Sequence, residues 1–89
     1  MSTNGARKEL ATFLTKARVF KGMSHKDAAK KTGIPERFLR QAEEDGSLLP
    51  PAQLKKLCEV YEVQYGWAVD AAEKDVGGSI RELYERVAT

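Results

Sequence analysis

Cysteine and histidine are nearly absent from this chain of 89 residues, which contains one of each, Cys58 and His25. A single cysteine excludes an internal disulfide, and one cysteine with one histidine cannot build a structural zinc site of the usual Cys/His type. A catalytic triad would have to use His25, and no nucleophile stands out beside it. The only glycine pair, Gly77-Gly78, lacks the Lys-Ser or Lys-Thr of a phosphate loop. We therefore expect neither an enzyme nor a bound metal or other cofactor.

Long apolar runs are also missing. No stretch approaches the ~18 residues that a membrane-spanning helix requires. Residues 1–8 are polar and no continuous apolar segment follows them, so a secretory signal peptide is not expected. With 42% hydrophobic and 31% charged residues, the composition is that of one globular domain. These features predict a cytoplasmic protein that has no contact with a membrane.

Charge is present but unevenly distributed along the chain. Residues 1–41 contain ten basic and three acidic side chains, whereas residues 42–89 contain five basic and ten acidic ones. The net charge is therefore +7 in the first part and −5 in the second, although the whole chain carries only +2. This asymmetry favours a basic surface in the first part that attracts an anionic partner.

Apolar residues recur with helical spacing throughout the chain, and alternating strand patterns are nearly absent. Ser24 with an acidic residue, Asp27, three positions later predicts the start of one helix, and Gly33 ends that helix. Pro35 suits the first turn of the next helix because its missing N–H needs no partner there. Together these signals predict an all-α fold with helices at about 6–20, 25–32, 35–44, 52–61, 64–74 and 80–88.

Several residues are expected to serve the core or a subunit contact. Trp67 should pack its helix against the first or the last helix, because tryptophan buries a large area. Cys58 lies on an apolar stripe and is expected to be an inert buried thiol. The last helix carries a stripe that either completes the core or forms a homodimer contact, made by Ile80, Leu83, Tyr84 and Val87.

Two short helices joined by residues 32–34 have the spacing of a helix-turn-helix unit. Residues 22–29 (Gly-Met-Ser-His-Lys-Asp-Ala-Ala) and 33–35 (Gly-Ile-Pro) resemble the Cro/C1-type (XRE) family. That family reads Gly, hydrophobic, Ser, Gln, two variable residues, hydrophobic, Ala, and then Gly, hydrophobic, Ser. The resemblance implies a lambda-repressor-like domain of five to six helices with an extra C-terminal helix. We divide the chain into a flexible N-terminal arm (1–5), the helix-turn-helix domain (6–63) and C-terminal helices for core completion or dimerisation (64–89).

The resemblance also implies a structural ion pair. The family's arginine four residues before the glycine corresponds to Arg18, and its glutamate late in the third helix corresponds to Glu43. We expect the pair to be partly buried between the first and third helices, since a guanidinium can bond a carboxylate through two parallel N–H groups.

In this family the third helix enters the major groove of DNA. The matching base-contacting positions are Glu36, Arg37 and Gln41. Arg37 can bond guanine O6 and N7, Gln41 can bond adenine N6 and N7, and Glu36 can accept from cytosine N4. Further contacts to phosphates or bases are expected from His25, Lys26, Lys30, Lys31, Phe38 and Arg40.

The function implied is that of a sequence-specific, double-stranded DNA-binding regulator of bacterial or phage character, a homodimer and a repressor. Three residues depart from the family pattern: His25 replaces Gln, Pro35 replaces Ser, and Phe38 replaces a small polar residue. An exposed Phe38 suits either a thymine methyl or a protein interface.

Two alternatives to this regulator remain open. Residues 34–39, 43–46 and 49–50 are similar to the cytoplasmic helix-turn-helix of RodZ-type cell-shape proteins. That similarity implies protein binding through Phe38 and the third helix without DNA. The other alternative is an antitoxin that shares the fold and binds DNA to regulate its own gene.

Overall fold

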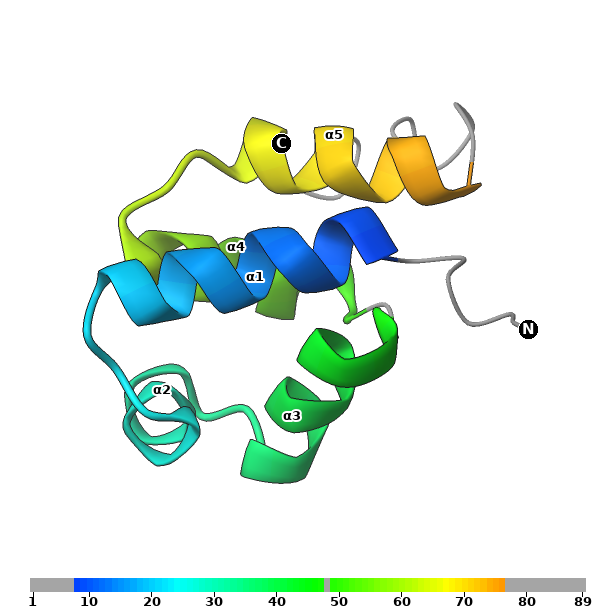
Figure 1. Cartoon of the computed structure of the whole chain (residues 1–89). Coiled ribbons are helices and arrows are strands. Elements are labelled where there is room, and N and C mark those ends of the chain that lie inside the picture. The colour runs from blue at the N-terminus through cyan, green and yellow to red at the C-terminus, as the bar shows by residue number, and fades with distance from the viewer. Residues whose placement is uncertain (1–7, 48, 77–89) are drawn as a thin grey trace.

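The computed structural model describes residues 8–47 and 49–76, which form five α-helices joined by short connections (Figure 1). No strand occurs in those two ranges, and the expected all-α fold is confirmed. The expected arm at 1–5 and the expected helix at 80–88 lie outside the described residues. The helices are α1 (Lys8–Phe20), α2 (His25–Thr32), α3 (Glu36–Asp45), α4 (Pro51–Tyr61) and α5 (Tyr65–Val76).

The boundaries of α2 follow the predicted signals. The Ser24 hydroxyl accepts a hydrogen bond from the Asp27 backbone N–H at 3.0 Å, and the Asp27 carboxylate accepts one from the Ser24 N–H at 3.3 Å. These two bonds are the capping box, which satisfies backbone donors at the helix start. Gly33 ends α2 in the left-handed region with φ 78°, a conformation that other residues rarely adopt.

The prediction that α3 begins at Pro35 is wrong by one residue. Pro35 has φ −55° and ψ 136°, so it is extended and stands before the helix, and its carbonyl accepts from the Phe38 and Leu39 N–H groups. Helix α4 is likewise preceded by an extended proline, Pro50, and a second proline, Pro51, occupies its first turn. A proline at the first helical position costs nothing, since the N–H it lacks would have no partner there.

Helix α1 occupies the centre of the fold (Figure 1). It packs against α3 on one side and against α5 on the other, and α1 and α5 run in opposite directions. Helix α4 completes the core through its contacts with α2 and α5. The largest fully buried side chains are Tyr61, Leu10, Leu14, Leu39, Leu54, Leu57, Val69 and Cys58.

Trp67 is less buried than its sequence position predicts. Its surface is 52% exposed, whereas Ala68, Val69 and Ala72 form the inward side of α5 and are essentially buried. Only about half of the Trp67 surface is therefore buried, so the expectation that this residue mainly packs helices together is wrong for the other half. Small residues bring α5 close to the core, and this leaves the large indole at the edge of the helix contact.

Cys58 is buried, as expected for an inert thiol. It is 1% exposed, and burial raises the pKa of its thiol from 9.0 to about 12. Only the thiolate reacts with alkylating reagents, so a raised pKa lowers the reactive fraction at neutral pH.

We expect iodoacetamide at pH 8 to alkylate Cys58 at least ~10³-fold more slowly in the folded protein than in urea, because the pKa shift alone reduces the thiolate by that factor. Mass spectrometry follows the reaction at one site, since the chain has one cysteine. Equal rates in the two conditions would show that Cys58 is not held in the core.

Candidate nucleic-acid interface

A short turn sets the relative position of α2 and α3. The Thr32 hydroxyl donates to the Ala28 carbonyl at 2.8 Å and accepts from the Ile34 N–H at 3.1 Å. Ile34 is 2% exposed and packs into the core directly after Gly33. The turn is therefore held both by hydrogen bonds and by a buried side chain, and it presents α3 in one orientation.

Helix α3 has one buried face and one exposed face. Leu39 and Ala42 are each 1% exposed and point inward. Arg37 and Gln41 are one turn apart and point to roughly the opposite side of the helix. Both side chains are exposed. Two of the three side chains predicted to contact bases, Arg37 and Gln41, therefore share the outer face of α3.

Phe38 stands at the edge of that face. The residue is 38% exposed, and the Arg37 guanidinium carbon lies 5.3 Å from the ring centroid. This is the geometry of a cation–π contact, which holds an otherwise mobile arginine against a fixed surface. A groove of about 230 Å³ adjoins the ring, lined by Phe38, Gln41, Ser47, Leu49, Pro50 and Gln53.

The charged residues around this face are partly paired. Arg40 and Glu36 form an exposed ion pair one turn apart, with Nη2 of Arg40 2.7 Å from Oε2 of Glu36. The negative charge of Glu36 is thus offset within α3. Helix α2 carries three exposed ammonium groups, those of Lys26, Lys30 and Lys31.

Arg18 and Glu43 form the ion pair that the family resemblance implies. Nε of Arg18 lies 2.8 Å from Oε2 of Glu43, and Nη2 lies 3.1 Å from Oε1, so the contact is bidentate. Nη1 of Arg18 also donates to the Met23 carbonyl at 2.7 Å. The side chains are only 15% and 8% exposed, and the hydrogen bond to Glu43 raises the pKa of Arg18. The pair joins α1 to α3 and to the loop before α2.

His25 has a structural contact that the sequence analysis missed. Its Nε2 atom lies 3.0 Å from Oε1 of Glu43, and the Thr15 hydroxyl donates to the same oxygen at 3.2 Å. The His25 side chain is 19% exposed. It was expected to contact phosphate, whereas this geometry engages Nε2 with Glu43. Eighteen positions separate the two residues, and no sequence pattern signals a contact at that separation.

The remaining expectations about the site concern other parts of the chain. The proposed dimer stripe at 80–87 lies outside the described residues. In the part of the chain that the structure describes, no helix is long and apolar enough to cross a membrane. The same residues contain no group of three His, Cys, Asp or Glu side chains that could hold a metal ion.

Comparison with known families identifies the fold. The model of a helix-turn-helix family matches residues 14–67, which include most of α1, all of α2, α3 and α4, and the start of α5. The chain belongs to this family of Cro/C1-type (XRE) helix-turn-helix domains, which bind DNA. Searches of curated proteins and of solved structures gave no match.

We expect Glu43→Ala to lower the free energy of unfolding by about 3–5 kcal/mol, because it leaves the partly buried Arg18 guanidinium without its carboxylate. Glu43→Gln should cost less, since the amide oxygen still accepts one hydrogen bond. Urea unfolding followed by circular dichroism measures both.

The matched control is Glu44→Ala, which removes an exposed carboxylate from the neighbouring position of α3. Exposed charges contribute little, so the change should stay within about 0.5 kcal/mol. Equal losses from the two alanine variants would contradict a structural role for the Arg18–Glu43 pair.

Proposed function

We propose that the protein is a sequence-specific regulator of transcription that binds double-stranded DNA with α3 in the major groove. The observation that carries the proposal is the exposed pair of Arg37 and Gln41 on the outer face of α3. They stand on the second helix of a helix-turn-helix domain, the element that enters the groove in DNA complexes of this fold. Both side chains can form two hydrogen bonds to one base edge.

The contacts of Arg37 favour a role in reading a base. A free arginine side chain loses rotamer entropy when it binds, and its position over the Phe38 ring reduces that loss. Arg37 then presents its N–H groups beside the ring, where guanine O6 and N7 would lie. Phe38 is exposed enough for its ring edge to meet a thymine methyl.

The distribution of charge suggests different roles for α2 and α3 in DNA binding. Helix α3 contains more acidic than basic side chains, and acidic groups repel phosphates. Affinity must then come largely from the lysines of α2, while α3 supplies the discrimination between bases. The Glu36–Arg40 pair would open on DNA, so that Glu36 accepts from a cytosine and Arg40 reaches a phosphate or base.

The same proposal includes repression and a symmetric dimer. A domain bound across a promoter excludes other proteins by occupying the DNA. Two domains related by a two-fold axis read two half-sites about one helical turn apart, which multiplies the contacts of each short α3. The cytoplasm is the compartment in which this activity would take place.

A second candidate function is favoured by one observation in the groove beside Phe38. The Oε1 atom of Gln53, which lines this groove, is buried and has no hydrogen-bond partner among the described residues. A protein partner that inserts an apolar side chain and an N–H donor there would satisfy it. Gln53→Leu separates the two functions, because Gln53 is not among the proposed DNA contacts.

We expect Arg37→Ala to weaken binding to the preferred DNA by about 1–3 kcal/mol and to relax the preference at one base pair. Sites selected by the wild-type protein from a random duplex library supply the DNA, and fluorescence anisotropy measures affinity. Lys74→Ala is the control, because Lys74 is an exposed cation on α5, which lies across α1 from α3 (Figure 1). If both variants bind and select alike, α3 does not read the DNA in this register.

A different result is expected for Lys30→Ala. Lys30 is an exposed cation of α2, so its loss should weaken binding to all duplexes similarly and reduce the slope of log affinity against log salt by about 1. Titrations at several salt concentrations measure that slope. An unchanged slope, or a loss confined to one sequence, would show that Lys30 does not contact a phosphate.

A further inference from the structure

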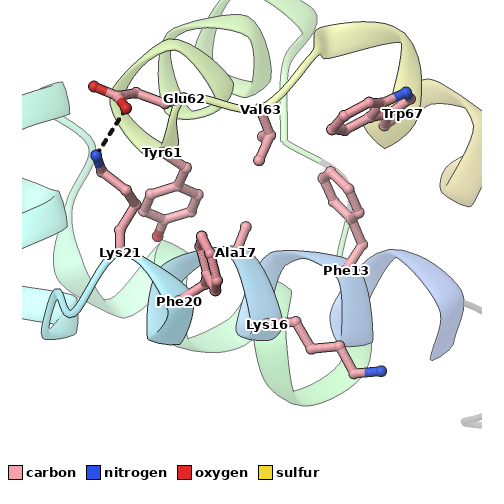
Figure 2. A pocket seen from close by; sticks show the side chains of 9 residues that line it. All are labelled: Phe13, Lys16, Ala17, Phe20, Lys21, Tyr61, Glu62, Val63 and Trp67. Atoms are coloured by element: carbon pink, nitrogen blue, oxygen red, sulfur yellow. Dashed lines mark ion pairs between the residues drawn. The ribbon is translucent and has the colours of Figure 1, made fainter.

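Aromatic surface gathers where the end of α1 meets the start of α5. Phe20 is 92% exposed and Trp67 is 52% exposed, and both border one groove of about 530 Å³ (Figure 2). In Figure 2 the Phe13 ring on α1 points toward the Trp67 ring on α5, while Phe20 stands at the other end beside Tyr61. The groove is lined by Phe13, Lys16, Ala17, Phe20, Lys21, Tyr61, Glu62, Val63 and Trp67.

Such a surface has the organisation of a protein interface. Exposed aromatic rings next to an apolar groove are unfavourable in water, and aromatic residues are enriched among those that dominate binding energies. The rim of this groove is charged, with Nζ of Lys21 2.9 Å from Oε1 of Glu62 and Lys16 exposed nearby. An apolar centre within a polar rim is the common arrangement of protein contacts.

The protruding side chain and the groove belong to the same face, so the surface is complementary to itself. In a two-fold dimer the same patch pairs on both chains, and each chain offers both parts of the contact. Phe20 of each copy can enter the other's groove between the rings of Phe13 and Trp67. The charged rim is also complementary to itself. Lys21 of one copy can pair with Glu62 of the other across the two-fold axis, because the two side chains carry opposite charges.

The patch is also placed where pairing leaves the proposed DNA-reading face free. Helix α1 lies between α5 and the α2–α3 unit (Figure 1). The exposed face of α3 carries Arg37 and Gln41, and neither residue lines the groove.

We propose that the groove between α1 and α5 is a homodimer surface, filled by Phe20 of a second copy of this chain. Its use in placing two α3 helices on DNA rests on the proposed function, but the contact itself does not. It differs from the contact expected at Ile80, Leu83, Tyr84 and Val87, and the two sites can be tested separately.

Sedimentation equilibrium of the full chain without DNA, from 1 to 100 μM, tests the contact. We expect a mass of twice 9.9 kDa at the upper concentrations. Phe20→Ser should raise the dimer dissociation constant at least ~30-fold, as for a residue that dominates an interface. Val19→Ser is the matched control, because Val19 is a neighbouring apolar residue of α1 that is 60% exposed but does not line the groove.

Fluorescence provides a second measurement at the contact itself, since Trp67 is the only tryptophan. Its emission should shift to shorter wavelength as the concentration rises, and Phe20→Ser should abolish that shift. Circular dichroism checks that each variant is folded. Because Phe20 is highly exposed, we expect its replacement to leave the fold intact.

Three results would overturn the proposal: a wild-type monomer at 100 μM, a Phe20→Ser variant that dimerises as tightly as the wild type, or a blue shift at constant monomer mass. Dissociation by Leu83→Ser, with Phe20→Ser still dimeric, would place the contact in residues 80–87 instead. A protein that dimerises through Phe20 but binds no DNA would refute the proposed function and leave this inference standing.

Discussion

The bidentate contact between Arg18 and Glu43 is the interaction on which the rest of the structure depends. It joins α1 to α3, and through Met23 and His25 the same group of hydrogen bonds reaches the loop before α2 and the start of that helix. The partial burial of both charges makes the contact specific in geometry, because polar atoms withdrawn from water need partners. The outer face of α3 therefore has one orientation relative to the core, which a surface that discriminates between bases requires.

Local signals in the sequence explain why so much of the fold could be predicted. The capping box at Ser24 and Asp27 and the left-handed glycine at position 33 act over a few residues, and the structure forms α2 within those bounds. Leu39 and Ala42, which are three positions apart on α3, are both buried, as helical spacing leads one to expect. The Arg18–Glu43 pair could be expected only from the family resemblance, since twenty-five positions separate its members.

The features that the sequence did not reveal arise from packing between elements. Pro35 is compatible with either side of a helix boundary, and its extended ψ angle places it before α3. His25 contacts Glu43 because the turn brings α2 and α3 together. Trp67 remains half-exposed because the small residues beside it determine how closely α5 approaches α1. The contact of Arg37 with Phe38 depends on the rotamers of both side chains, and the spacing of residues along a helix does not determine rotamers.

We propose that the exposed face of α3 distinguishes one DNA sequence from others. The most direct test of this proposal is fluorescence anisotropy of the wild-type protein with a duplex from upstream of its own gene, titrated beside a scrambled duplex of the same composition at two salt concentrations. If α3 reads bases, the native duplex should be preferred at least ~10³-fold and the affinity should fall steeply with salt. Weak and equal binding to both duplexes at low salt would contradict it.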